Sequence, residues 1–139
     1  MNKQLVLITD KMNTIKNMMR FERYDGHYTL YMDNNICGTC SYVIPSDNKT
    51  LIYITYLEIS DGYKNMGYGT ILLYRVFSDA YHDGVTHVNL DDVSDNCHKQ
   101  NNIYKRMGLW YVDGKDDNTM CGNLRNILYG RKNYRSLCV

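Results

Sequence analysis

The glycine-containing segment from Lys64 to Thr70 has the residue types of an anion-binding turn. It follows the apolar run 51–59 and leads directly into residues with helical periodicity. The first N–H groups of a helix lack carbonyl partners, and the helix dipole places partial positive charge at the same end, so a phosphate group is stabilised there. Gly67 and Gly69 carry no side chain that would hold a ligand away from the backbone. The segment therefore predicts a phosphate-binding turn between a strand and a helix.

Two other glycine motifs are excluded by the residues present. A Walker phosphate loop requires a lysine followed by Ser or Thr after its second glycine, and no lysine follows Gly67 or Gly69. A dinucleotide-binding fingerprint requires a third glycine where this chain has Leu72, although Asp91 and Asp92 lie at the distance where that motif places an acid. A plain glycine turn that binds no ligand is the remaining alternative.

The elements that position this turn follow from the hydrophobic periodicity. Alternating apolar residues predict three strands joined by hairpin turns, at 28–32, 36–44 and 51–59. Apolar residues at helical spacing predict a helix from about 69 to 82, and 85–90 follows as a short strand. A strand, a helix and a second strand in this order form a crossover unit with parallel strands. The turn is therefore expected where a meander meets a crossover.

The patterns on either side of this centre predict further elements. Residues 4–9 predict a first strand, and apolar residues at three- and four-residue spacing predict a helix from Met12 through about Arg20. After the crossover, 95–107 predicts a helix that ends at Gly108.

The C-terminal part is expected to complete the sheet. Residues 109–112 predict a strand, 113–122 a polar loop and 123–129 a last strand. The order of the elements predicts a mixed α/β sheet rather than a doubly wound one. We expect a single domain over 1–130 and a basic tail over 131–139.

Composition and charge exclude several classes of function. The chain has 139 residues, and its 16 Lys and Arg nearly balance its 15 Asp and Glu, for a net charge of +1. This balance gives no basis for a nucleic-acid-binding surface. The sequence has neither an apolar run of the roughly 20 residues that span a bilayer nor a signal-peptide pattern. We expect a soluble cytoplasmic protein that binds neither nucleic acid nor membrane.

The five cysteines are expected to be reduced thiols, because no secretory signal accompanies them. Cys37 and Cys40 have the spacing of a metal or redox pair. In a strand, however, residues three apart lie about 10 Å apart and point to opposite faces, whereas a disulfide requires Cα atoms within about 7 Å. Cys97, His98 and Cys121 do not supply the second close pair that a zinc site requires. We therefore expect no metal site.

Two motifs give the chain a family resemblance. Leu57-x-Ile59 followed by Lys64-Asn65-Met66-Gly67-Tyr68-Gly69 is similar to a Leu-x-Val strand with an Arg/Gln-x-x-Gly-x-Gly/Ala loop. Asn96 followed by Ile103-Tyr104-Lys105-Arg106-Met107-Gly108-Leu109 is similar to the pattern Asn-x-x-Ala-x-x-Leu-Tyr-x-x-x-Gly-Phe. With these motifs in this order, the chain resembles the GNAT superfamily of N-acetyltransferases over about residues 30–112.

The resemblance implies transfer of an acetyl group from acetyl-coenzyme A to a primary amine of a small molecule or protein. It implies that Tyr104 acts as general acid for the leaving thiolate and Asp91 as general base, with Glu58 as the other candidate base. It places the coenzyme on the main chain of the loop, on the preceding strand and on the second motif, at Leu57, Ile59, Lys64, Asn65, Met66, Gly67, Tyr68, Gly69, Thr70 and Asn96.

Departures from both motifs leave a second interpretation open. Lys64 replaces the usual Arg or Gln, and Asn96 stands eight residues before Tyr104 rather than seven. Tyr104 has the alternative role of an ordinary core tyrosine, and Asp91 that of a solvated carboxylate that attracts a cationic amine. The alternative function is a catalytically inactive GNAT-fold module that binds a partner protein. A homodimer is a further hypothesis, and no motif identifies the acceptor.

Overall fold

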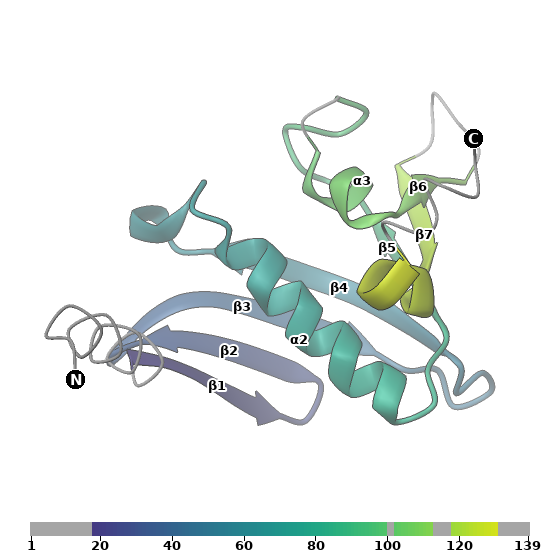
Figure 1. The fold of residues 1–139 in the computed structure, drawn as a ribbon, viewed down its shortest axis with the longest axis horizontal. Helices are drawn as coiled ribbons and strands as arrows, with labels where there is room; N and C mark the ends of the chain where they lie inside the picture. The colour runs from purple at the N-terminus through teal and green to yellow at the C-terminus, as the bar shows by residue number, and fades with distance from the viewer. Residues whose placement is uncertain (1–17, 100–101, 113–117, 131–139) are drawn as a thin grey trace, which may run out of the picture.

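The computed structural model describes residues 18–99, 102–112 and 118–130 and contains one seven-stranded mixed sheet (Figure 1). The strand order is β1-β2-β3-β4-β5-β7-β6. The elements in chain order are β1 (Met19–Tyr24), β2 (His27–Met32), β3 (Asn35–Val43), β4 (Leu51–Ile59), η1 (Asp61–Tyr63), α2 (Tyr68–His82), β5 (His87–Asp91), α3 (Ile103–Met107), β6 (Trp110–Tyr111), β7 (Thr119–Asn123) and η2 (Asn126–Gly130). The predicted fold class, a mixed α/β sheet, is confirmed.

The predicted meander and crossover are both present. Strands β1 to β4 are antiparallel neighbours, whereas β4 and β5 are parallel and are connected through α2. Helix α2 has 15 residues and begins near the end of β4 that carries the glycine loop (Figure 1). The chain therefore reverses direction at the glycine loop and crosses one face of the sheet before it enters β5.

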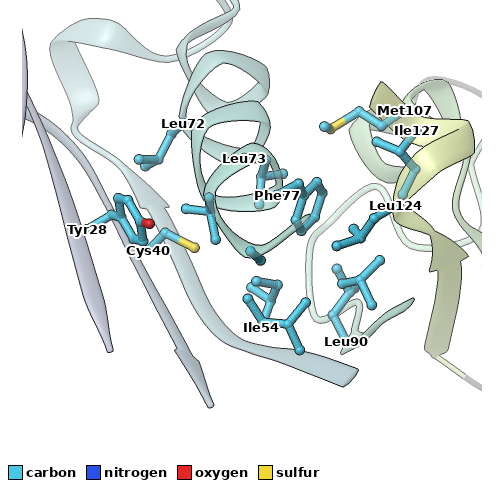
Figure 2. Close-up of a cluster of buried hydrophobic side chains, with 14 of the residues drawn as sticks. Tyr28, Cys40, Ile54, Leu72, Leu73, Phe77, Leu90, Met107, Leu124 and Ile127 are labelled. Carbon is cyan, nitrogen blue, oxygen red and sulfur yellow. The ribbon is translucent and has the colours of Figure 1, made fainter. Parts of the chain in front are cut away.

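The hydrophobic core lies between this face of the sheet and the helices. Figure 2 shows side chains of α2 among those of β2 to β5, with side chains of α3 and of the segment around η2 on one side of the cluster. The buried residues labelled there are Tyr28, Cys40, Ile54, Leu72, Leu73, Phe77, Leu90, Met107, Leu124 and Ile127. Burying one large apolar side chain contributes about 1.5–3 kcal/mol, so this cluster fixes the helices to one face. Among the described residues, no helix covers the opposite face.

The predicted helix through about Arg20 is wrong at its C-terminal end, because β1 begins at Met19. Met19 and Phe21 pack against the core, and the hairpin to β2 turns at Asp25 and Gly26, whose φ values are 40° and 83°. Positive φ at both central residues is the two-residue turn that Asp-Gly favours. The dipeptide Asp25-Gly26 is thus the sequence signal for the hairpin that pairs β1 with β2. The rest of the first predicted strand and helix lies outside the described residues, as does the tail 131–139.

The C-terminal prediction is also wrong in its details. Strand β7 lies at Thr119–Asn123, within and just beyond the predicted loop, and the predicted strand 123–129 is largely replaced by the helical turn η2. The core accounts for this difference, because Ile127 packs so close to Gly122 that a Cβ there would lie 3.0 Å from its Cδ1 atom. The helix predicted at 95–107 is shorter than expected and spans only α3.

The prediction that Cys37 and Cys40 point to opposite faces is wrong. The pairing of β2 with β3 shifts so that Leu30 lies opposite Gly38 and Tyr31 opposite Ile36, which makes Cys37 an extra, bulged residue. Both cysteines are consequently buried in the same core cluster, as unpaired thiols. Burial raises the pKa of the Cys40 thiol to about 12, so this cysteine is protonated at neutral pH.

Candidate functional site

The glycine loop has the backbone conformation of an anion-binding turn. Asn65 and Gly67 have φ values of 62° and 88°, and Gly67 is the N-cap of α2. The first intrahelical bond runs from the N–H of Ile71 to the carbonyl of Gly67, 3.2 Å away. The N–H groups of residues 68–70 therefore have no carbonyl partner within the helix. Three adjacent amide donors at the positive end of the α2 dipole can bind an anion.

A cavity of about 550 Å³ lies directly beside these amides. Its lining includes most of the residues that the sequence predicted for coenzyme binding, namely Ile59, Lys64, Asn65, Gly67, Tyr68, Gly69, Thr70 and Asn96. Leu57 and Met66 are not part of the lining, and the Met66 side chain is 65% exposed. The loop, the end of β4 and the second motif thus converge on one cavity.

Four lining residues were not predicted from the sequence: Tyr63, Ser94, Ile103 and Arg106. Arg106 adds a cation to the cavity wall. The ammonium of Lys64, also on this wall, pairs with the Asp61 carboxylate at 3.0 Å. A Cβ on Gly69 would lie 3.1 Å from Ile103, so the glycine allows α3 to approach the start of α2. This close approach brings Arg106 to the cavity, and local sequence patterns do not reveal contacts between separate helices.

Strands β4 and β5 separate next to this cavity. Their parallel pairing runs only as far as Ile54 and Leu90, and a register shift in the pairing of β4 with β3 follows at Thr55. We call the opening beyond this last pair the β4/β5 split. The Ser60 N–H donates to the Cys37 carbonyl at 2.8 Å. Hydrogen-bonded and non-hydrogen-bonded residue pairs alternate along an antiparallel ladder, so this bond fixes which residues of β4 direct their main-chain groups at β3.

The same alternation defines which main-chain groups of β4 border the split. Because Glu58 exchanges its main-chain bonds with β3, the N–H and C=O groups of Leu57 and Ile59 point the other way, into the split. The split therefore offers a row of strand donors and acceptors to an extended ligand. Both residues lie where the resemblance places main-chain contacts to the pantetheine arm.

Tyr104 lies on α3, on the covered side of the sheet, and is partly buried. Burial is the main cause that raises its pKa to about 12, and the negative charge of Asp92 acts in the same direction. The phenol is thus protonated at neutral pH and can donate a proton or a hydrogen bond.

Asp91 lies at the end of β5 on the opposite, uncovered face. Its carboxylate accepts hydrogen bonds from the hydroxyls of Tyr53, at 2.7 Å, and Thr119, at 3.0 Å. Glu58 pairs with Thr39 and is exposed on the same face, because the side chains of the neighbouring Leu57 and Ile59 pack against the core. The two candidate bases therefore share one face of the sheet, and Tyr104 lies on the other.

The chain matches the family model described as acetyltransferase (GNAT) family over residues 6–109, which is more than half of its length. The chain belongs to the GNAT acetyltransferase family. No curated protein sequence matches this chain at a significant level.

Solved structures share the fold of this GNAT-family chain at low sequence identity. Ard1 from Thermoplasma volcanium is 17% identical with a TM-score of 0.57, over 85% of this chain and 78% of that one. PaiA N-acetyltransferase from Thermoplasma acidophilum, in complex with coenzyme A, is 16% identical with a TM-score of 0.57, over 87% and 71%. AtaTR bound with AcCoA is 16% identical with a TM-score of 0.58, over 88% and 81%. These likenesses establish the fold.

Beside the cavity of this GNAT-family chain lies a buried polar network around Asp92, which is 1% exposed. Its carboxylate accepts hydrogen bonds from the Ser94 hydroxyl and N–H, from the Tyr111 hydroxyl at 2.8 Å and from the Asn102 side-chain amide at 2.7 Å. Burial alone would raise the pKa of Asp92, but these hydrogen bonds outweigh it and hold the pKa below its usual value.

Asp92 is therefore expected to make stability depend on pH in the acid range. A carboxylate whose folded pKa is depressed stabilises the fold above its unfolded pKa of about 3.9, and this contribution is lost as pH falls through the lower, folded value. We expect Asp92→Asn to cost about 1–3 kcal/mol at pH 7 in urea unfolding, and less at pH 3. The exposed Asp47→Asn variant is the control, with less than about 0.5 kcal/mol at either pH. Equal losses for Asp92→Asn at both pH values would contradict the assignment.

The described residues contain no group of three His, Cys, Asp or Glu side chains that could hold a metal ion. No helix among them is both long and apolar enough to cross a membrane.

Proposed function

We propose that this protein is an acetyl-coenzyme-A-dependent N-acetyltransferase that acts on a primary amine. One observation carries the proposal: the cavity beside the unpaired amides of α2 lies next to the β4/β5 split. Coenzyme A consists of a nucleotide diphosphate followed by an extended arm. The diphosphate requires an anion site, and the arm requires a row of main-chain donors and acceptors next to it. A catalytically inactive scaffold has no need for this arrangement.

The residues of the cavity fit the chemical groups of coenzyme A. The N–H groups of Tyr68, Gly69 and Thr70 would hold the diphosphate, and Arg106 adds a guanidinium that can pair with a phosphate. The main-chain groups of Leu57 and Ile59 would bind the pantetheine amides, as a further strand binds a sheet edge. When bound, acetyl-coenzyme A supplies the thioester whose acetyl group is transferred.

The proton transfers are assigned to side chains on the two faces of the sheet. Transfer forms a bond between the acceptor nitrogen and the acetyl carbon and breaks the bond from that carbon to sulfur. The Tyr104 phenol, with its raised pKa, donates its proton to the leaving thiolate. The acceptor ammonium must first lose a proton, and Asp91 receives it on the uncovered face. The attacking nitrogen loses a second proton as the amide forms, which restores the proton that Tyr104 gives to the thiolate.

The charge of the uncovered face supports an amine acceptor. Strands β3 to β7 contain no lysine or arginine, and this face carries the carboxylates of Asp91 and Glu58. An ammonium ion is attracted to such a surface, and an anionic acceptor is repelled. The hydroxyls of Tyr53 and Thr119 hold the Asp91 carboxylate in one orientation. An amine therefore meets a fixed negative charge next to the split.

The direct test of the proposed function is coenzyme A release from acetyl-coenzyme A with a panel of primary amines, including polyamines, aminoglycosides and peptide N-termini. We expect amine-dependent release with at least one of them. Mass spectrometry of the product should show the addition of one acetyl group. Absence of release across the panel, with folded protein and bound coenzyme, would leave the inactive interaction module as the better interpretation.

Replacing Asp91 by asparagine is expected to act on the acceptor rather than on the coenzyme. The change removes the fixed charge and the proton acceptor, so kcat/KM for the amine should fall by about 10-fold or more. Coenzyme affinity should stay within about twofold, because Asp91 lies on the other face of the sheet from the cavity. Steady-state kinetics with varied amine measure the first quantity and calorimetry the second. A loss in coenzyme affinity alone would contradict the assignment.

A further inference from the structure

The network around Asp92 contains a second buried polar side chain, Asn102, which is fully buried. Its amide nitrogen donates to the Asp92 carboxylate at 2.7 Å and to the Asn96 carbonyl at 3.0 Å. Its amide oxygen accepts from the main-chain N–H groups of Tyr104, at 2.9 Å, and Lys105, at 3.2 Å. Asn102 is therefore both the N-cap of α3 and the link from α3 to the end of β5.

The link has strict chemical requirements. The cap needs an acceptor for two helix amides, whereas the buried Asp92 carboxylate needs a donor. One asparagine side chain supplies both groups at once, in a fixed orientation. Serine would supply the cap without an amide donor, and aspartate would place a second carboxylate against the first. Tyr111 on β6 completes the arrangement through its own bond to Asp92 at 2.8 Å.

Helix α3 depends on this network for its position. It has five residues, fewer than an isolated helix needs to be stable in water, so tertiary contacts must hold it in place. The same five residues include Tyr104, the proposed general acid, and Arg106 on the cavity wall. A general acid must lie within hydrogen-bond reach of the leaving atom, so a small displacement of α3 removes its effect.

We propose that Asp92 is a positioning residue that acts through Asn102 to hold Tyr104 at the β4/β5 split. This inference rests on the proposed function, and it assigns to a buried carboxylate a role that neither sequence motif contains. Asp92 is not among the residues that line the cavity, and its bonds to Asn102 and Tyr111 set the N-terminus of α3 relative to β5 and β6. Its negative charge also raises the pKa of Tyr104, which favours the protonated phenol.

A double-mutant cycle tests the coupling of Asp92 to Tyr104. Asp92→Asn should lower kcat by about 10-fold or more when Tyr104 is present, and by less than about twofold in the Tyr104→Phe background. A merely structural role would lower kcat by the same factor in both backgrounds, and that result would overturn the proposal. Circular dichroism and melting curves confirm that each variant is folded at the assay temperature. Should Asp92→Asn not fold, Tyr111→Phe removes a single hydrogen bond from the same carboxylate and replaces it in the cycle.

A matched control is available at the far end of α2. The Asp79 carboxylate accepts a hydrogen bond from the buried Tyr28 hydroxyl at 2.7 Å, much as Asp92 does from Tyr111. Asp79→Asn therefore removes a comparable buried-tyrosine contact outside the site. Its kcat should stay within about twofold of the wild-type value. A decrease in kcat equal to that of Asp92→Asn would show that general destabilisation of the fold explains both effects, and would overturn the proposal.

A spectroscopic readout separates this inference from the proposed function. With tyrosine labelled at Cζ, the Tyr104 signal is assigned by its absence in Tyr104→Phe. We expect Asp92→Asn and Asn102→Ser to move this signal in the absence of any substrate, and Asp79→Asn to leave it in place. If the wild-type protein transfers no acetyl group but the signal moves, only the proposed function fails. If the signal does not move, the positioning role fails.

Discussion

Replacing Tyr104 by phenylalanine is expected to lower kcat by about 100-fold or more, the usual contribution of a positioned general acid. The substitution removes only the hydroxyl, so the apolar contacts of the ring with the core remain. Coenzyme affinity should change by less than about twofold, because the cavity lining does not include Tyr104. A decrease in kcat at unchanged affinity means that the hydroxyl acts in the transition state rather than in binding.

The control for Tyr104 is another buried tyrosine with a raised pKa. Burial is the first cause that raises the pKa of Tyr28, and its hydroxyl bonds to Asp79 on the far half of α2. Tyr28→Phe should destabilise the fold by about 0.5–1.5 kcal/mol and leave kcat within about twofold. Steady-state kinetics at saturating substrates and urea unfolding measure the two quantities. If Tyr104→Phe retains wild-type kcat, Tyr104 is an ordinary core tyrosine.

Replacing Gly67 by alanine is expected to weaken coenzyme binding by about 10- to 100-fold, the value of one charge-assisted hydrogen bond. Gly67 has a φ of 88°, which an L-residue adopts only with strain. Relief of that strain rotates the peptide that leads into the unpaired amides of residues 68–70. A Cβ atom at Gly67 would meet no protein atom within 4 Å, so it would project into open space beside the cavity rather than into the core.

Two other glycines separate strain from binding. Gly84, beyond the opposite end of α2, has a φ of 97°, and a Cβ there also has open space around it. Gly84→Ala should cost about 1–2 kcal/mol of stability, as Gly67→Ala does, while coenzyme affinity stays unchanged. Gly62→Ala, on the segment that precedes the loop, has neither strain nor a close neighbour and should alter neither quantity. Calorimetry that finds equal affinity for Gly67→Ala and Gly84→Ala would contradict the anion-binding role of the loop.

The parts of the fold that could be predicted from the sequence are those fixed by local pattern. Alternation predicts β2 to β4, helical spacing predicts α2, and the crossover follows from their order. The loop is recognisable from the sequence because its spaced glycines lie directly between a strand and a helix in the chain. The family resemblance assigned Ile59 and Asn96 to coenzyme binding, and both line the cavity.

The remaining errors come from contacts between distant segments. The bulge that buries Cys37 depends on the pairing of β3 with β2, and the strand β7 depends on its place between β5 and β6. Arg106 reaches the cavity only because α3 packs against α2 at Gly69. Asn102 could have been recognised as a helix N-cap, but its bond to Asp92 joins residues ten apart across two elements.

Binding of a coenzyme diphosphate by the unpaired amides at the start of α2 is the central requirement of the proposed function. An amide NMR titration of ¹⁵N-labelled protein with coenzyme A observes these groups one by one. We predict saturable shifts for the amides of Tyr68, Gly69 and Thr70, with the amide of Gly84, beyond the opposite end of α2, serving as an internal reference that moves little. A titration at about 1 mM coenzyme, the upper end of usual enzyme affinities, that leaves these three amides unmoved would contradict the account.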